Sequence, residues 1–228
     1  AIESYRTAAR ICPDSAEVRT YLARAFMDAN QDDEALRELA ISLELDPQSF
    51  DVRLNLGVVL ERKGLHEEAI EQLREAVAIL PDNPRGHFNL ALSLHGAGHY
   101  EEAEKEYRKV LDLDQNDFGT HYNLGITYEV QGRYAEAVSE YEAALHLEPS
   151  FADAYNNLGN CYRRLGRHAE AIVAFQAAIQ SAPGHSDALY NLGCSLDNEQ
   201  DLDAAIATYR QLLDLRPNFP TGHANLAS

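Results

Sequence analysis

The prolines of this sequence recur at a fixed interval, and that interval constrains the fold more than any other feature. Six of the eight prolines share one register of a 34-residue period, and Gln115 stands at the one register that is skipped. The six are Pro13, Pro47, Pro81, Pro149, Pro183 and Pro217. Pro84 and Pro220 share a second register, three residues later. A sustained period of this length indicates a stack of structural repeats and not one compact core.

Other residue columns keep the same period. One column is leucine followed by glycine or alanine, beginning at Leu22 and ending at Leu226. Another is alanine throughout, at Ala1, Ala35, Ala69, Ala103, Ala137, Ala171 and Ala205. Small residues allow two helices to cross closely, so we expect these columns at helix crossings, with bulky residues filling the space beside them.

Within one period the local pattern is helical. In residues 50–83 the apolar side chains recur every three or four positions on both sides of Gly64, which indicates two amphipathic helices. Gly64 can take the left-handed backbone conformation that ends a helix, and proline stops the second helix. Gln200 occupies the register of this glycine near the end of the chain, so we expect a weaker or distorted turn there.

These columns resemble the tetratricopeptide repeat family, whose pattern combines Leu-Gly, a Gly-then-Tyr turn, alanine, an aromatic residue and proline. Residues 118–151 carry that pattern at His121, Leu124, Gly125, Tyr128, Gly132, Tyr134, Ala137, Tyr141, Ala144 and Pro149. The match extends over the whole chain, and its departures are Glu104, Gln115 and Gln200. The resemblance implies an all-α fold, a right-handed superhelical solenoid of antiparallel helix pairs.

The period divides residues 1–228 into what we expect to be a single array. Six full repeats span 16–49, 50–83, 84–117, 118–151, 152–185 and 186–219. Residues 1–15 correspond to the second helix of an earlier repeat, and residues 220–228 begin a further one. Both ends interrupt a helix pattern without a polar capping face, so we expect this sequence to be a segment of a longer protein.

Composition narrows the classes of partner. A formal charge of -18 disfavours binding to nucleic acid or to an anionic membrane surface. No apolar run approaches the ~18 residues that cross a bilayer, so direct membrane insertion is not expected. Cys12, Cys161 and Cys194 are odd in number and far apart, which argues against a disulfide scaffold and favours a reducing, cytoplasmic compartment.

No arrangement of residues in the sequence supports catalysis. The nearest metal motif begins at His66 and Glu67, but Ile70 stands where the second ligand is required. The histidines at 87, 121 and 223 share one register, and they fit a structural role better than a metal site because successive repeats lie ~10 Å apart. The sequence therefore predicts a protein that is not an enzyme and binds no metal and no cofactor.

A column of asparagines marks a candidate binding surface. In the resembled family a concave wall is lined by the second, fifth, sixth, ninth, twelfth and thirteenth residues of each repeat. The sixth residue is asparagine at Asn55, Asn89, Asn123, Asn157, Asn191 and Asn225, with Tyr21 in the first full repeat. An amide offers two donors and one acceptor, which suit the backbone of an extended peptide. The same side chains can instead bond the neighbouring repeat, and both interpretations stay open at this point.

The other wall positions change character along the chain. The second to fourth full repeats would form an apolar strip from Leu54, Val58, Phe88, Leu92, Tyr122 and Ile126. The fifth repeat is polar and basic, with Asn156, Asn160, Arg163 and Arg164, and Tyr190 follows in the sixth. An exposed apolar strip usually marks an interaction surface, although flanking helices or a second copy could cover this one.

These features predict a non-catalytic protein-interaction scaffold that binds an extended peptide or a partner helix in its concave groove. The fifth position lacks the lysine of relatives that clamp a carboxylate, so that specificity is not expected, although Arg163 and Arg164 could meet an acidic group.

Two alternatives follow from the asparagine column, which we call the ladder, and from the two ends of the sequence. The ladder and residues 218–228 are similar to the repeat arm of O-linked N-acetylglucosamine transferases, so the chain could be a substrate-recruiting arm of a larger enzyme such as a glycosyltransferase. The uncapped ends could instead stack between copies and give a self-associating structural scaffold.

Overall fold

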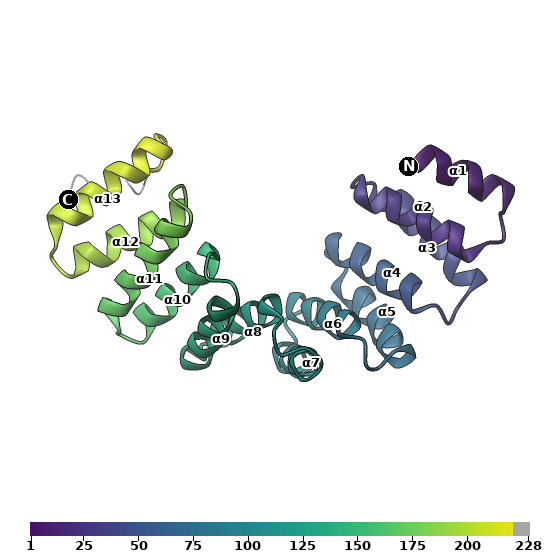
Figure 1. Cartoon of the computed structure of the whole chain (residues 1–228), viewed down its shortest axis with the longest axis horizontal. Helices are drawn as coiled ribbons and strands as arrows, with labels where there is room; N and C mark the ends of the chain where they lie inside the picture. Colours follow the sequence, from purple (N-terminus) through teal and green to yellow (C-terminus); the bar gives the residue numbers. More distant parts are fainter. Residues whose placement is uncertain (221–228) are drawn as a thin grey trace. The chain divides into compact units, whose positions relative to one another are not determined.

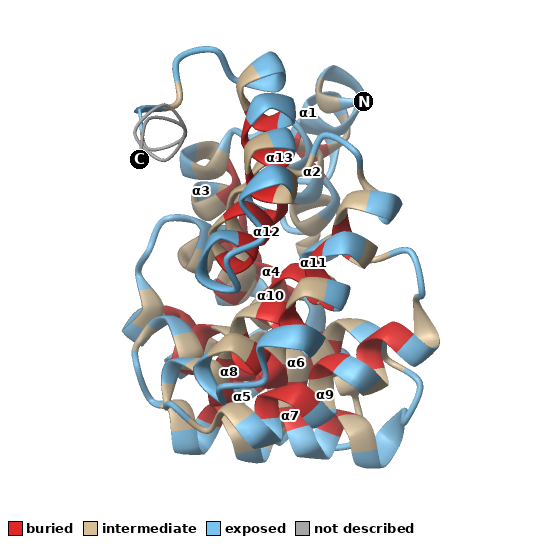
Figure 2. Cartoon of the chain, turned by 90° about the vertical axis from the view of Figure 1, so that its left-hand side faces the viewer, coloured by how far each residue is buried: buried red, intermediate tan, exposed pale blue. Residues whose placement is uncertain are grey.

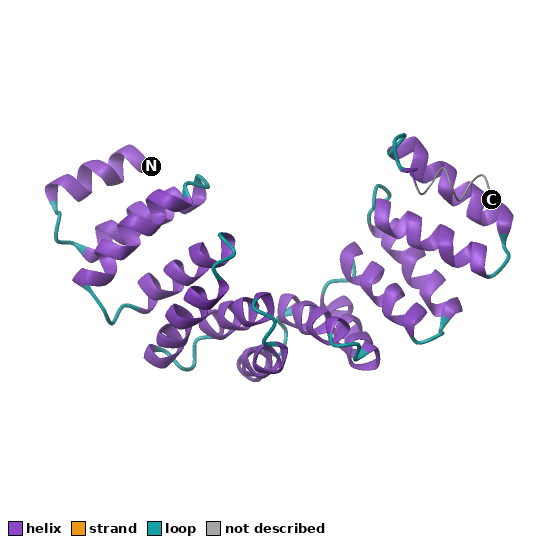
Figure 3. Cartoon of the chain, turned by 180° about the vertical axis from the view of Figure 1, so that it is seen from behind, coloured by secondary structure: helices purple, strands orange, loops and turns teal. Residues whose placement is uncertain are grey.

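The computed structural model describes residues 1–220, which form thirteen helices joined by short loops and contain no strand (Figures 1 and 3). The helices are α1 (Ile2–Ile11), α2 (Ala16–Asp28), α3 (Asp32–Leu45), α4 (Phe50–Arg62), α5 (His66–Ile79), α6 (Pro84–Gly96), α7 (Tyr100–Leu113), α8 (Phe118–Val130), α9 (Tyr134–Leu147), α10 (Ala152–Arg164), α11 (His168–Ser181), α12 (Ser186–Asn198) and α13 (Leu202–Leu215).

The chain divides into two compact units, which we call unit 1 (Ala1–Gln115) and unit 2 (Asn116–Ser228). Unit 1 contains α1 to α7, and unit 2 contains α8 to α13. Within each unit the two helices of a repeat pack on each other, and the second also packs on the first helix of the next repeat. This arrangement is the predicted all-α solenoid of antiparallel helix pairs (Figure 1). That the two units form one continuous array stays a prediction.

Most first helices begin at a short polar side chain. Ser15, Ser49, Asn83 and Asp117 each accept a hydrogen bond from a backbone N–H two or three residues further on. Such capping satisfies N–H groups that the first helical turn leaves without a partner. Pro84 occupies the first turn of α6, where the missing N–H costs nothing.

The expectation of a distorted turn at Gln200 is wrong. Gln200 has a φ of 63°, in the left-handed region that Asn30 occupies in the first full repeat and glycine in the next four. Its N–H donates to the Asp197 carbonyl at 2.9 Å, and the Asp201 N–H donates to the Leu196 carbonyl at 3.0 Å. This pair of hydrogen bonds is a standard helix-ending motif, and it holds a conformation that costs a non-glycine residue ~1–2 kcal/mol.

The small residue columns lie at the helix crossings, as predicted. The alanines from Ala35 to Ala171 are fully buried, and Ala205 is 3% exposed. A Cβ atom added to Gly159 would lie 2.5 Å from the ring of Phe175, so only glycine permits this approach. Figure 2 shows buried residues on the faces where helices meet and exposed residues on the outer turns. Ala1 is the exception to its column, because it is exposed and precedes α1.

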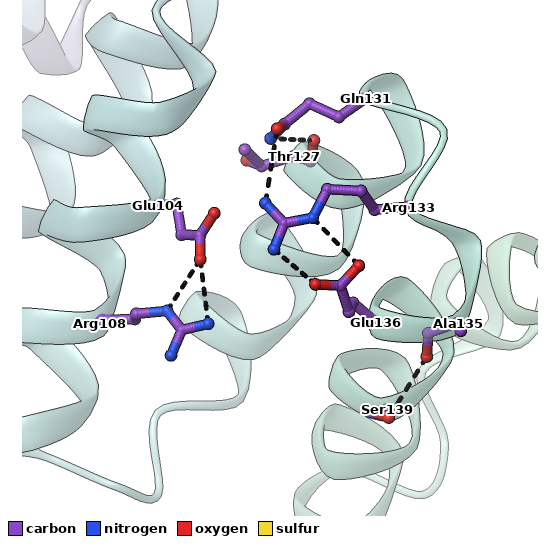
Figure 4. A network of polar contacts seen from close by, with 8 residues as sticks. All are labelled: Glu104, Arg108, Thr127, Gln131, Arg133, Ala135, Glu136 and Ser139. Carbon is purple, nitrogen blue, oxygen red and sulfur yellow. Dashed lines mark hydrogen bonds and ion pairs between the residues drawn. The ribbon is translucent and has the colours of Figure 1, made fainter.

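Glu104 departs from the apolar residue that the family pattern expects. Its side chain is 17% exposed and forms an ion pair of 2.9 Å with Arg108, one turn further along α7 (Figure 4). The departure is therefore accommodated because the buried part of the carboxylate is neutralised on the same helix.

Candidate functional site

The first helices of the repeats lie closer together than the second helices. In unit 1, α4 contacts both α2 and α6, and in unit 2, α10 contacts both α8 and α12. Contacts of this kind do not join successive second helices in the described residues. In each unit the first helices therefore form the inner side of the stack. We use the term wall for the side chains at the second, fifth, sixth, ninth, twelfth and thirteenth residues of each repeat.

Most of the predicted apolar strip lies on this wall. In unit 1, Val58, Phe88 and Leu92 are half-buried, so part of each side chain reaches solvent. Leu54 does not belong to this surface, because it is only 1% exposed. Phe88 at the same register is half-buried and packs edge-on against Tyr107, with ring centroids 5.9 Å apart.

Unit 2 carries aromatic residues at the same register. Tyr122 is half-buried, and its ring centroid lies 4.6 Å from that of Phe151. Tyr190 is half-buried, and its ring centroid lies 5.5 Å from that of Phe219. Ile126 is half-buried one helical turn beyond Tyr122. These side chains are fixed by packing and still expose part of their surface, as contact residues of a binding surface must.

The asparagines of unit 1 do not bond another repeat. The Asn89 Nδ2 donates to the Arg85 carbonyl of its own helix at 2.8 Å. Asn55 is 9% exposed and makes no side-chain hydrogen bond with a described residue. Tyr21 takes this register in the first repeat, where it is 41% exposed and donates to Glu17 at 3.0 Å.

Two asparagines of unit 2, Asn157 and Asn191, connect successive repeats. Asn191 Nδ2 donates to Asn156 Oδ1 at 2.9 Å, and Asn156 Nδ2 donates to Asn157 Oδ1 at 3.3 Å. Asn157 Nδ2 then donates to the hydroxyl of Tyr122 at 3.2 Å. We call this chain of four side chains the amide relay. Asn156 is 8% exposed, so the relay has a buried centre.

Two further members of the ladder lie outside the relay. Asn123 resembles Asn89, since its Nδ2 donates to the Gly119 carbonyl of its own helix at 2.8 Å. Asn225 lies outside the described residues.

The asparagine column alone does not reveal which residue of the preceding repeat it bonds. Both bonds between repeats join the sixth residue of one repeat to the fifth residue of the preceding one, 35 residues earlier. Tyr122 and Asn156 can accept a hydrogen bond at that position, whereas Leu54 cannot accept one from Asn89. Bonds between repeats form at Tyr122 and Asn156, whereas Asn89 and Asn123, which follow Leu54 and Phe88, bond carbonyls of their own helices.

Unit 2 also carries the predicted basic pair. Arg163 is half-buried, and its Nη2 donates to Asn160 Oδ1 at 3.2 Å. Arg164 is exposed at the end of α10. Neither guanidinium forms an ion pair with a described residue, so the fifth repeat presents positive charge that an acidic ligand could neutralise.

The Tyr122 hydroxyl can still donate a hydrogen bond. Burial, and then the charge of Asp153, raises the pKa of the Tyr122 hydroxyl above its ordinary value. The hydroxyl oxygen already accepts from Asn157, so its own hydrogen remains to donate to a ligand. The wall of unit 2 therefore offers hydrogen-bond donors beside apolar rings.

Two of the three aligned histidines have structural partners. His87 is 3% exposed, with Nδ1 lying 2.6 Å from Glu106 Oε2 and Nε2 lying 2.7 Å from the Pro81 carbonyl. His121 Nδ1 lies 2.7 Å from Glu140 Oε2. His223 lies outside the described residues.

Residues 1–220 contain no group of three or more His, Cys, Asp or Glu side chains that could hold a metal ion. No helix in this part of the chain has both the length and the apolar character that a bilayer span requires.

The family of the chain follows from its sequence. A tetratricopeptide repeat model matches residues 20–84 and 122–186, a TPR repeat model matches residues 94–132, and a further tetratricopeptide repeat model matches residues 162–228. The chain therefore belongs to the tetratricopeptide repeat family. No curated protein sequence matches it.

Solved structures of other repeat proteins share the fold. PilF of Pseudomonas aeruginosa is 21% identical, with a TM-score of 0.77 over 93% of this chain and 96% of that one. YrrB, described as a TPR protein with an unusual peptide-binding site, is 24% identical, with a TM-score of 0.69 over 83% of this chain and 98% of that one.

A third structure, of the APC/C hetero-tetramer Cut9–Hcn1, is 19% identical with a TM-score of 0.74. It matches 98% of this chain and 44% of the other. These likenesses show the fold, and the family supports a role in protein interaction.

Proposed function

We propose that this chain is a non-catalytic scaffold that binds an extended peptide or a partner helix along the walls of its repeats. The observation that carries the proposal is the surface of the first helices. There, half-exposed apolar side chains such as Leu92 and Ile126 alternate with amides that retain hydrogen-bonding capacity. Apolar contacts would supply affinity, and the amides would pair with the backbone of the ligand.

The amides support this role best where they are held in place without being fully used. Asn89 and Asn123 each commit one N–H to a carbonyl of their own helix. That bond fixes the direction of the side chain, so less conformational entropy is lost when a ligand binds. The amide oxygen and the second N–H then suit the alternating N–H and C=O groups of a peptide backbone.

The two walls suit different side chains of a ligand. The unit 1 wall offers Val58, Phe88 and Leu92, which favour an apolar side chain. The unit 2 wall offers Arg163 and Arg164, which favour a carboxylate, because guanidinium and carboxylate groups form charge-assisted hydrogen bonds. The peptide-binding site described for YrrB is a precedent for such a role within the shared fold.

Peptide selection tests this function directly. A phage-displayed library of random peptides is selected on the immobilised chain, and the best synthetic peptide is titrated by fluorescence anisotropy. The variant Asn89→Ala/Asn123→Ala/Asn157→Ala should raise its Kd at least ~tenfold, which corresponds to ~1.4 kcal/mol, while circular dichroism shows unchanged helical content.

A matched triple variant on second helices controls for general effects. Glu71→Ala/Glu75→Ala/Lys105→Ala removes three exposed side chains and should leave the Kd unchanged. Equal affinity of the wall variant and the native chain for the selected peptide contradicts the role of the asparagines. Failure to select any peptide contradicts the proposed function.

A further inference from the structure

A polar cavity lies on the unit 1 wall, where the first full repeat meets the second. Its volume is about 250 Å³, and it is bounded by α2, by the start of α4 and by the loop that joins α3 to α4. The lining residues are Ala16, Glu17, Thr20, Tyr21, Arg24, Asp46, Ser49, Asp51 and Val52. Several of them, such as Tyr21 and Asp51, occupy wall positions. A ligand that follows the unit 1 wall therefore meets this cavity.

Carboxylates are in excess around the cavity. Glu17, Asp46 and Asp51 contribute them, whereas Arg24 contributes the one guanidinium of the lining. None of these four groups forms an ion pair with a described residue. The carboxylates are thus not neutralised within the chain, and the formal charge of -18 adds to the negative potential around them.

An exposed aromatic ring lies among these carboxylates. Tyr21 is 41% exposed and stacks on Tyr5, with ring centroids 5.9 Å apart. Its hydroxyl donates to Glu17 Oε1 at 3.0 Å, and this hydrogen bond, followed by the charge of Glu17, raises the pKa of the Tyr21 hydroxyl above its ordinary value. A ring that is held beside carboxylates suits a cation, because the ring face attracts positive charge and a carboxylate pairs with it.

An amide without a partner borders the cavity. Asn55 is 9% exposed, follows Asp51 by one turn of α4 and makes no side-chain hydrogen bond with a described residue. At the same register Asn157 and Asn191 reach the fifth residue of the preceding repeat. For Asn55 that residue is Thr20, which lines the cavity. A buried polar group without a partner requires one, and a ligand in the cavity can supply it.

We propose that this cavity binds a cationic side chain of the peptide ligand, arginine in preference to lysine, with Tyr21 against its plane and Glu17 and Asp51 paired with its charge. The inference rests on the proposed function, because it names one residue of the ligand that the wall binds. A guanidinium is the better fit, since it can stack on an aromatic ring while its N–H groups donate to carboxylates on either side.

Other occupants fit the cavity less well. A metal ion needs ligands that converge on one point, and residues 1–220 contain no group of three or more suitable side chains. Acidic residues in a first helical turn also complement the helix dipole, a role that Glu17 and Asp51 share with Asp187 of α12. The dipole does not account for the ring of Tyr21 or for the unpaired amide of Asn55. A cation accounts for both.

A small probe tests the cavity without a selected peptide. N-acetylarginine methylamide is titrated into the ¹⁵N-labelled native chain, and the backbone amide signals are followed by NMR. Saturable shift changes are expected at Glu17, Tyr21 and Asp51. N-acetylcitrulline methylamide has nearly the same shape without the charge, so it should bind at least ~tenfold more weakly. Added salt should weaken the binding of the arginine probe, because it screens the attraction.

Variants locate the binding. Glu17→Gln/Asp51→Asn removes two charges at exposed positions and should raise the Kd of the arginine probe at least ~tenfold. Tyr21→Leu keeps the charges, removes the ring and should raise the Kd ~threefold. The charge-matched control Glu71→Gln/Glu75→Gln alters two exposed carboxylates of the second helix α5 and should leave the Kd unchanged. Circular dichroism should show unchanged helical content in all three variants.

Three results overturn the proposal. They are the absence of saturable shift changes at the cavity, equal binding of the arginine and citrulline probes, and undiminished binding of the arginine probe to the Glu17→Gln/Asp51→Asn chain. Any of them leaves the proposed scaffold function to be decided by peptide selection. A failed peptide selection together with a successful arginine titration contradicts the scaffold function and not the cation site.

Discussion

The wall of unit 1 and the wall of unit 2 carry asparagine at the same register but use it differently. In unit 1, Asn89 turns back to its own helix, because the residue 35 positions earlier is Leu54. In unit 2, Asn191 reaches the preceding repeat, because the residue 35 positions earlier is Asn156. One residue type at one register can therefore face a ligand or join two repeats. For Asn89, Asn123, Asn157 and Asn191, the bond to the preceding repeat forms only where the fifth residue of that repeat is Tyr122 or Asn156.

Both units have buried alanines at their helix crossings, and the largest predicted effects concern these alanines. Ala69 in unit 1 and Ala137 in unit 2 are both fully buried at helix crossings. Ala69→Leu and Ala137→Leu should each lower the free energy of unfolding by ~1–3 kcal/mol, because added bulk forces the helices apart. Urea denaturation followed by circular dichroism measures this loss. An unchanged midpoint for Ala137→Leu would mean that the alanine column does not lie at the crossing.

The next effect distinguishes the two uses of asparagine. Asn156→Ala removes an acceptor and a donor of the amide relay and leaves the Asn191 amide unpaired, which should cost ~1–2 kcal/mol of unfolding free energy. Asn55→Ala removes a side chain that bonds no described residue and should cost less than ~0.5 kcal/mol. Equal losses in urea denaturation would remove the distinction between the two walls.

A smaller effect isolates one bond of the relay. Tyr122→Phe deletes the hydroxyl that accepts from Asn157 and keeps the ring that packs on Phe151. In a double-mutant cycle with Asn157→Ala, the coupling energy should be ~0.5–1 kcal/mol, the usual net value of a neutral hydrogen bond. The same cycle between Leu54→Ala and Asn89→Ala in unit 1 is the control, and a comparable coupling there would show that the relay is not specific to unit 2.

The smallest predicted effect is a pH dependence of the unfolding free energy that comes from Tyr162 of unit 2. Burial, and then the hydrogen bond to Glu142, raises the pKa of Tyr162 to about 12. Above pH 10 an unfolded tyrosine ionises while folded Tyr162 keeps its proton, so stability is complete below pH 10 and falls as the pH rises towards 12.

Tyr162→Phe tests this pH dependence. The substitution should reduce the slope of unfolding free energy against pH between 10 and 12, measured by urea denaturation. Phe26, Leu60 and Leu94 hold this register in unit 1, where no such group titrates. An unchanged slope in the Tyr162→Phe chain would assign the alkaline sensitivity to other tyrosines.

The fold was readable from the sequence because each periodic residue has one dominant physical role. Proline ends a helix, glycine takes a positive φ, and alanine permits a crossing, whichever side chains surround them. The bounds of helices such as α4 and α5 follow from these residues. Gln200 was misjudged because the sequence shows the strain of a positive φ but not the two backbone hydrogen bonds that compensate for it.

The candidate site was less predictable, because its properties depend on pairs of residues that are distant in the sequence. The register of Leu54 placed it on the wall, yet its side chain is 1% exposed, whereas Phe88 at the same register is half-buried. The amide relay required knowing that Asn191 reaches Asn156 rather than a backbone carbonyl of α12.

The central claim is that ligands bind along the first helices. Site-specific photo-crosslinking tests it most directly, with p-benzoylphenylalanine introduced in turn at Leu92 and Ile126 of the wall, and at Glu75 and Ser139 of the second helices. Irradiation with the selected peptide should crosslink it to the two wall positions and not to the two outer positions. Crosslinking at Glu75 or Ser139, without crosslinking at Leu92 or Ile126, would contradict the account.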